Sequence, residues 1–86
     1  MTDATTRRIS GRVTVRLRPG VLDVQGQAVA GALGDLGFGP TRVRVGKVFE
    51  IEVDAADADA ARVRLTEMAT RLLANPVMED FEVEVD

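Results

Sequence analysis

Polar and apolar residues alternate with a period of two along the stretch from Arg42 to Asp54. On both sides of Gly46-Lys47-Val48, apolar side chains take the odd-numbered positions and charged side chains the even-numbered ones. This period predicts two strands, each with one buried face and one exposed face. The apolar residues share a face only if the loop has an odd length, so a hairpin turning at Gly46-Lys47-Val48 is expected.

Two helices are predicted by apolar residues that recur at spacings of three and four. The first helix covers residues 23–36, with Asp23 as its N-cap and Gly37 as the glycine that ends it. The second helix is expected to be capped by Asp54 and to end at Asn75-Pro76, because proline cannot continue a helix.

Further strands over residues 9–17 and 81–86 complete the order β-α-β-β-α-β. This order predicts an α+β, ferredoxin-like fold, in which a four-stranded antiparallel sheet of order 4-1-3-2 has two helices on one face. Residues 1–8 are expected to form a flexible N-terminal segment, and residues 9–86 a single domain.

The distribution of charge agrees with this order of strands. Residues 1–48 contain eight basic and three acidic residues, whereas residues 49–86 contain three basic and eleven acidic ones. In the order 4-1-3-2, acidic and basic strands alternate on the polar face of the sheet, so neighbouring strands attract each other. The basic half is therefore expected to pair within the fold rather than to bind nucleic acid. No apolar stretch is long enough to span a membrane, so no membrane partner is expected either.

The composition argues against catalysis by this chain. It contains no Cys, no His and a single Ser, and it has no phosphate-binding or zinc-binding motif. We therefore expect no catalytic, cofactor-binding or metal-binding residue. Among proteins of this topology, RNA-recognition domains need aromatic residues on the open sheet face, which is charged here. Acylphosphatases need an Asn near a phosphate-binding Arg, and the only Asn, Asn75, is far from Arg18 along the chain. Amino-acid-sensing domains remain open, because fold alone does not choose among functions.

The first predicted helix carries a row of small residues on its outer face. Glycine inside a helix lowers its stability by about 1 kcal/mol relative to alanine, so two glycines in one row require an explanation. Either the folded protein tolerates a weak helix, or the row provides a flat surface against which another chain packs. The expected Gly46-Lys47 turn and the edge strands of the sheet are further candidate interfaces. The candidate interface residues are Gln27, Ala30, Gly31, Gly34, Gly46 and Lys47.

Three segments resemble a known family, the PurS small subunit of phosphoribosylformylglycinamidine synthase. They are residues 17–26, LRPGVLDVQG; residues 43–47, VRVGK; and residues 72–77, LLANPV. The resemblance runs from about Gly11 to Val85. One departure is Val24, which stands where the family typically has proline. Proline at the first helical position presets the turn, so Val24 is expected to loosen the start of the helix.

The resemblance implies a non-catalytic subunit in de novo purine biosynthesis, in the cytoplasm. In that complex a glutaminase subunit releases ammonia, and a large synthetase subunit uses ATP and Mg to convert formylglycinamide ribonucleotide (FGAR) to formylglycinamidine ribonucleotide (FGAM). The small subunit, a homodimer or homotetramer that binds no cofactor itself, is implied to bridge the other two and to assist ammonia transfer. The alternative is a free-standing ferredoxin-like dimer that senses a small molecule.

Overall fold

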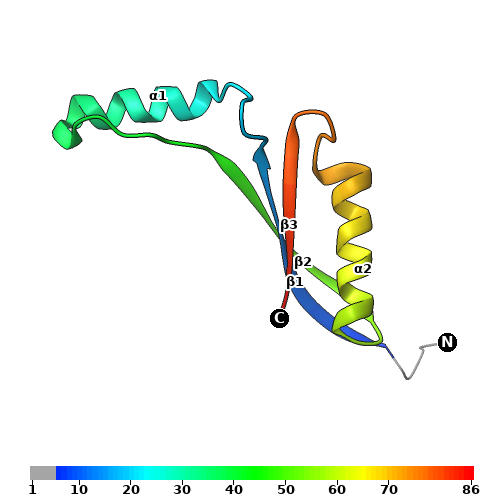
Figure 1. Cartoon of the computed structure of the whole chain (residues 1–86). Helices are drawn as coiled ribbons and strands as arrows, with labels where there is room; N and C mark the ends of the chain where they lie inside the picture. The colour runs from blue at the N-terminus through cyan, green and yellow to red at the C-terminus, as the bar shows by residue number, and fades with distance from the viewer. Residues whose placement is uncertain (1–5) are drawn as a thin grey trace.

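A computed structural model describes residues 6–86 as a three-stranded antiparallel sheet and two helices (Figure 1). A wider π-helical turn follows each helix: η1 follows α1, and η2 follows α2. The strand order is β2-β1-β3. The predicted α+β class, with two helices and an antiparallel sheet, is therefore confirmed. The elements are β1 (Arg7–Leu17), α1 (Val24–Leu33), η1 (Gly34–Phe38), β2 (Gly46–Ala55), α2 (Ala58–Met68), η2 (Ala69–Leu73) and β3 (Glu79–Val85).

The hairpin predicted between residues 42 and 54 is wrong. Gly46–Ala55 forms one uninterrupted strand, β2, whose first two residues pair with β1 instead of turning. Residues 41–45 lie outside the sheet and return along α1 as an extended segment (Figure 1). A period of two reports an extended backbone with two unlike faces, and it does not report where the hydrogen-bonding partner is. The sheet of residues 6–86 therefore has three strands instead of the predicted four.

The three strands that do form have the predicted neighbours, with β1 in the middle. On the polar face, Arg16 of β1 lies 2.8 Å from Glu82 of β3, and Arg8 lies 3.2 Å from Glu52 of β2. Arg12 contacts two carboxylates of the C-terminal segment, and they raise the pKa of its guanidinium, with Asp86 contributing most. Water screens exposed pairs of this kind, so each adds little to stability. The predicted alternation of acidic, basic and acidic strands is thus confirmed for β3, β1 and β2.

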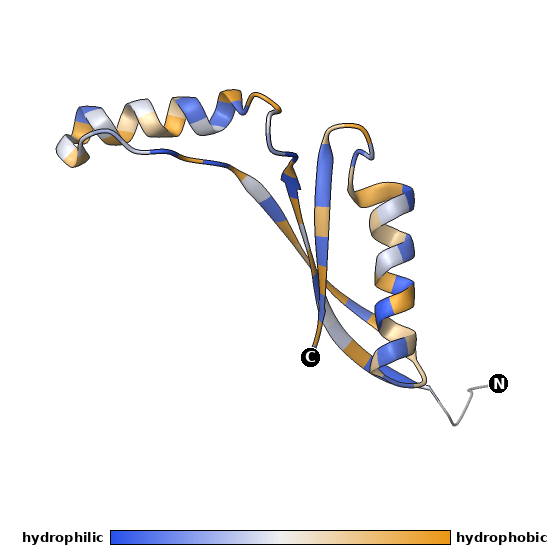
Figure 2. Cartoon of the chain, in the orientation of Figure 1, coloured by the Kyte–Doolittle hydropathy of each residue, from blue (hydrophilic) through white to orange (hydrophobic). Residues whose placement is uncertain are grey.

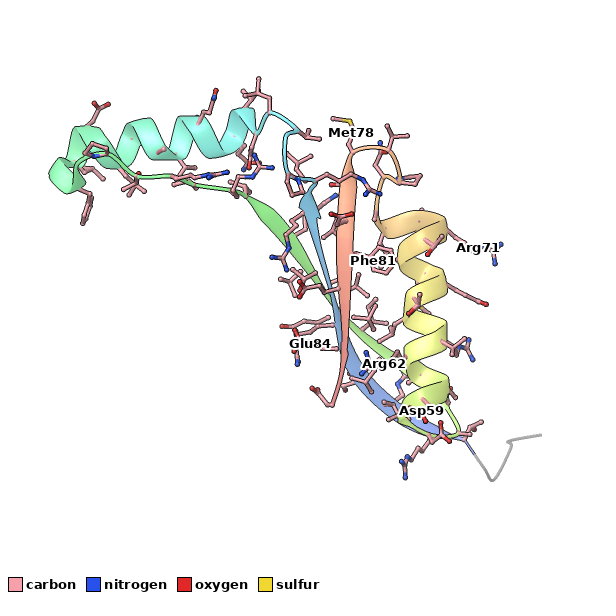
Figure 3. All side chains as sticks on the ribbon, in the orientation of Figure 1. Asp59, Arg62, Arg71, Met78, Phe81 and Glu84 are labelled. Atoms are coloured by element: carbon pink, nitrogen blue, oxygen red, sulfur yellow. The ribbon has the colours of Figure 1, made fainter. Side chains whose placement is uncertain are left out.

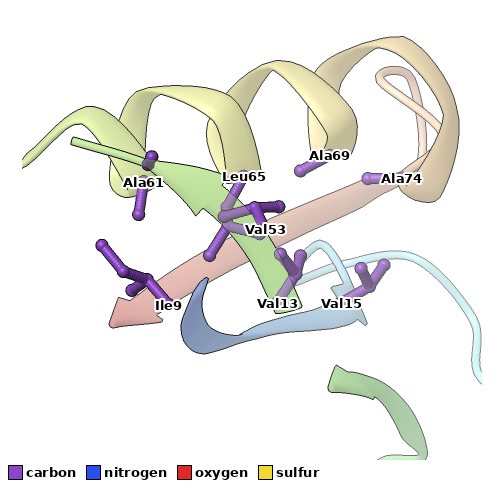
Figure 4. Packing of buried hydrophobic residues seen from close by; sticks show 9 residues of the cluster. Ile9, Val13, Val15, Val53, Ala61, Leu65, Ala69 and Ala74 are labelled. Atoms are coloured by element: carbon purple, nitrogen blue, oxygen red, sulfur yellow. The ribbon is translucent and has the colours of Figure 1, made fainter. Parts of the chain in front are cut away.

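Helix α2 covers the apolar face of the sheet and forms the core with it (Figure 4). Leu65 of α2 is fully buried, and its Cδ1 lies 2.6 Å from the point that a Cβ on Gly11 would occupy. Glycine at this point of β1 therefore lets the helix approach the sheet closely. Figure 3 shows Phe81 between β3 and α2, and Arg62 of α2 donates to the Val83 carbonyl at 2.9 Å. The buried residues are Ile9, Val13, Val15, Val53, Ala55, Ala61, Leu65, Ala69 and Ala74.

The boundaries of the elements agree only in part with the predicted ones. α1 itself ends at Leu33, but helical backbone continues into η1 until Gly37, whose φ of 94° ends it at the predicted glycine. The N-cap of α2 is Asp57, whose Oδ1 accepts from the Ala60 amide at 2.8 Å, so the prediction of Asp54 as this cap is wrong. Strand β1 begins at Arg7, two residues before its predicted start. Of the segment predicted to be flexible, residues 1–5 lie outside the described residues.

Helix α1 does not pack on the sheet, so the prediction of two helices on one face is wrong for this chain. Residues 24–45, here called the arm, project from the sheet and α2 (Figure 1). The radius of gyration is 17.3 Å, whereas a compact domain of this length has about 12 Å. The longest dimension is 58 Å. The arm therefore leaves exposed an apolar surface that a closed ferredoxin-like domain would bury.

Candidate partner interface

The side chains of residues 6–86 form no group of three that is suited to hold a metal ion. Within the same residues, neither helix is both long and apolar enough to cross a membrane. A hollow of about 400 Å³ lies between α1 and residues 41–44, open to solvent and lined by parts of the arm and its base. The described chain thus offers surfaces rather than a cluster of reactive groups.

The most unusual surface is the apolar one on the arm. Leu36 is 74% exposed and Phe38 is 70% exposed, and both lie at the outer end of the arm. Val24 is exposed at the inner end, so apolar bands recur along the whole arm (Figure 2). Single exposed apolar residues are common on proteins, but a row of them on a projecting element indicates a contact surface.

The apolar face of the sheet is also only partly covered. Phe49, Ile51 and Phe81 lie on the apolar face, yet each remains only half-buried with α2 in place. In a closed domain of the predicted fold, the first helix would lie beside the second on this face. Both the arm and part of the sheet therefore present apolar groups that residues 6–86 leave partly or largely exposed.

Four of the predicted interface residues lie on the arm. Gln27 and Ala30 line the hollow that faces residues 41–44. Gly31 and Gly34 are exposed, and a Cβ added to Gly31 would meet no atom within 4 Å. The small-residue row is therefore divided, since its first half faces the returning segment and its second half is open.

The other two predicted residues, Gly46 and Lys47, lie on the sheet and not in a turn. A Cβ on Gly46 would lie 2.8 Å from the Val15 carbonyl oxygen, so glycine permits a close approach of β2 to β1. The Lys47 ammonium lies 3.9 Å from the Glu79 carboxylate and 5.9 Å from the centre of the Phe49 ring. The six predicted residues therefore do not form one continuous patch.

Sequence reasoning missed the contact that closes the base of the arm. Asp23, the predicted N-cap of α1, is only 6% exposed. Its Oδ1 accepts from the Gly26 amide at 2.7 Å, which is the expected cap, and its Oδ2 accepts from the Val45 amide at 2.7 Å. These hydrogen bonds, from Val45 first and Gly26 second, lower the pKa of the Asp23 carboxyl. No local pattern predicts the second bond, because its two residues are 22 positions apart.

The Asp23 carboxyl is expected to titrate below the ordinary value for Asp, which is about 3.9. Because its pKa is lower in the folded chain than in the unfolded chain, its carboxylate stabilises the fold fully above about pH 4. That stabilisation is lost as the pH falls through the folded-state pKa. Carbon-13 NMR of the carboxyl group measures this midpoint directly, and a midpoint at or above about 3.9 contradicts the prediction.

Comparison with known proteins decides the family. Residues 10–86 match the family model of PurS, which is described as phosphoribosylformylglycinamidine (FGAM) synthase. The chain belongs to the PurS family. The resemblance drawn from residues 17–26, 43–47 and 72–77 is thereby confirmed.

Relatives and solved structures agree with this assignment to PurS. The FGAM synthase subunit PurS of Mycobacterium leprae is 50% identical over 72 residues, which cover 83% of this chain and 87% of the relative. The crystal structure of PurS from Thermotoga maritima has a TM-score of 0.87 at 27% identity and covers 94% of each chain. A chain in the structure of PurLQS from the same organism has a TM-score of 0.85 at 27% identity, covering 93% of this chain and 99% of its own length.

Proposed function

We propose that this PurS-family chain is the non-catalytic, structural subunit of a phosphoribosylformylglycinamidine synthase complex in de novo purine biosynthesis. It bridges the glutaminase subunit and the large synthetase subunit, and it assists ammonia transfer between them. The complex then performs the ATP- and glutamine-dependent conversion of FGAR to FGAM in the cytoplasm. ATP and Mg are held by the large subunit, and this chain contributes binding surfaces.

One observation carries this proposal: similarity to PurS subunits extends over nearly the whole chain. The match is not restricted to a motif that unrelated proteins share, since the family model covers residues 10–86. A neighbour of the same fold and nearly the same length is a chain in a structure titled PurLQS. The lack of Cys and His and the exposed apolar arm fit a subunit that works through contacts with other proteins.

Within that complex we infer a homodimer built on the arm. The radius of gyration of 17.3 Å and the exposed Leu36 and Phe38 support it, since a lone chain would keep this surface in water. In the dimer, the arm of each copy covers the apolar sheet face that α2 leaves open in the other copy. Residues 42–45 of each copy then form the fourth strand of the other copy's sheet, beside β2 of that copy. Such an exchange of an identical element gives a closed, symmetric dimer.

Reconstitution tests the proposed function. The purified chain is mixed with the glutaminase and synthetase subunits, and FGAM formation is measured with glutamine and, separately, with ammonium chloride. We expect the chain to stimulate the glutamine-dependent reaction much more than the ammonia-dependent one, because its role is to couple two proteins. Equal glutamine-dependent rates with and without the chain contradict the proposal. A thermal shift with amino acids or nucleotides, without stimulation, indicates the sensing dimer instead.

Filling the small-residue row is expected to weaken assembly. Gly31→Leu with Gly34→Leu places large side chains at open positions. Outside the helix's own backbone, a Cβ added to Gly31 would meet no atom within 4 Å, and one added to Gly34 would meet only the Gly39 carbonyl oxygen, at 3.9 Å. The chain should therefore fold, yet co-elute less with the two partner subunits. The matched control is Gly31→Ala with Gly34→Ala, which keeps the row narrow and favours the helix by about 1 kcal/mol per site. Unchanged co-elution of the leucine variant excludes the row as an interface.

A further inference from the structure

The base of the arm contains the one charged side chain among residues 6–86 that is buried, Asp23. An ordinary N-cap uses a single carboxylate oxygen to accept from an amide in the first turn of its helix. Asp23 does this with Oδ1, at 2.7 Å from the Gly26 nitrogen. Its Oδ2 accepts at 2.7 Å from the Val45 amide, which belongs to the segment that returns from the far end of the arm. One carboxylate therefore joins the outgoing and the returning parts of the arm.

Two further contacts close the same point. The Arg44 guanidinium donates to the Val21 carbonyl at 3.0 Å and to the Arg18 carbonyl at 3.1 Å, and both carbonyls precede α1. A Cβ on Gly26 would collide with the Val43 carbonyl oxygen, so glycine allows the helix and the returning segment to touch. The hydrogen bonds of Asp23 and Arg44, with the contact at Gly26, are here called the clasp.

The clasp is placed where the direction of the arm is set. Residues 41–45 have no strand pairing, and α1 does not pack on the sheet. Pairing with β1 begins only at Gly46, the first residue of β2. The clasp therefore joins the two segments that connect the arm to the sheet, and it restricts how they move relative to each other (Figure 1).

We propose that Asp23 is a positioning residue for assembly, whose clasp orders the arm before a second copy binds. A surface that is already ordered in the free chain loses less conformational entropy on binding, so the complex is tighter. The inference rests on the proposed homodimer, because it names what orients the arm toward the second copy. It does not depend on the identity of the reaction.

The test compares the same substitution at two helix caps. In Asp23→Asn, one acceptor oxygen becomes an NH₂ group that faces a backbone amide, so one of the two hydrogen bonds is lost. Asp57 caps α2 with a single bond, from its Oδ1 to the Ala60 amide, and Asn is as good an N-cap as Asp. Asp57→Asn is therefore the matched control, and any difference between the two variants reports on the clasp.

Two quantities are measured in each variant. Amide hydrogen exchange of Val45, followed by NMR at a concentration where the chain is monomeric, reports whether the clasp is closed. Analytical ultracentrifugation gives the dimer dissociation constant. In Asp23→Asn we expect exchange of the Val45 amide to accelerate at least about tenfold and the dimer dissociation constant to rise at least about tenfold. Asp57→Asn should leave both quantities within about twofold of the wild type.

Several outcomes overturn the proposal. Unchanged Val45 exchange in Asp23→Asn means that the clasp does not hold the arm, and an unchanged dissociation constant means that holding it does not aid assembly. If Asp23→Asn unfolds the sheet, Arg44→Met removes the clasp from the other side and must by itself weaken the dimer. A monomeric wild-type chain overturns the homodimer, whereas the Val45 result still decides whether the clasp exists. If the wild-type chain does not stimulate the glutamine-dependent reaction, that result contradicts the proposed function and not the role of the clasp.

Discussion

Replacing Leu65 with alanine is expected to lower the free energy of unfolding by roughly 2–5 kcal/mol. Leu65 is fully buried at the centre of the contact between α2 and the sheet, directly above Gly11. Removing its branched end leaves a cavity that neighbouring β1 cannot fill, because Gly11 has no side chain. Small domains have a total stability of only about 5–15 kcal/mol, so this loss is a large fraction. Urea unfolding followed by circular dichroism measures it.

The control for this prediction is Leu72→Ala in η2. Leu72 is 83% exposed, and exposed substitutions usually change stability by less than about 0.5 kcal/mol. All variants are compared at one protein concentration, because association makes the apparent stability rise with the logarithm of the protein concentration. If Leu65→Ala and Leu72→Ala unfold at the same urea concentration, α2 does not form the core described here.

Placing a charge at the end of the arm is expected to weaken self-association strongly. Phe38 is 70% exposed in the single chain, and burying one such side chain contributes roughly 1.5–3 kcal/mol. A symmetric dimer uses the residue twice, so Phe38→Asp should raise the dissociation constant at least about a hundredfold. Sedimentation equilibrium measures this constant, and small-angle scattering reports the elongated monomer that remains.

Val63→Asp is the matched control for the arm. Val63 is 60% exposed, but it lies on α2, on the far side of the helix from the sheet. The same change of apolar side chain to carboxylate should leave the dimer intact there. Dimers of equal strength in the wild type and in Phe38→Asp contradict the arm-mediated contact, whereas equal weakening in both variants indicates a general effect of charge.

Features that depend on neighbours in the sequence were predicted well. The glycine that ends the first helix, Gly37, and the cap at Asp23 follow from local backbone geometry and hydrogen bonding. The alternating charges of β3, β1 and β2 were also predicted, because opposite charges favour adjacent strands. Of the candidate interface, sequence alone located the exposed glycines Gly31 and Gly34, and their contact with a partner stays a prediction.

Features that depend on distant partners were not predicted. Asp54 and Asp57 are equivalent as caps by local chemistry, but Asp54 stays extended because it pairs with Arg8 of β1. Gly46 and Lys47 have the composition of a turn, yet pairing with β1 makes them the start of β2. The second hydrogen bond of Asp23 has the same origin, since Val45 reaches it only after the chain has turned at the end of the arm.

By itself, the sequence determined that the chain has two helices and an antiparallel sheet, approximately where they lie, which faces are apolar and which family the chain resembles. These properties arise from periodicity, capping and charge, all of which act over a few residues or between whole strands. Only the tertiary structure decided that residues 41–45 leave the sheet and that α1 projects from it. The reason is that an apolar face is equally well buried by the same chain or by another copy, and local pattern does not distinguish the two.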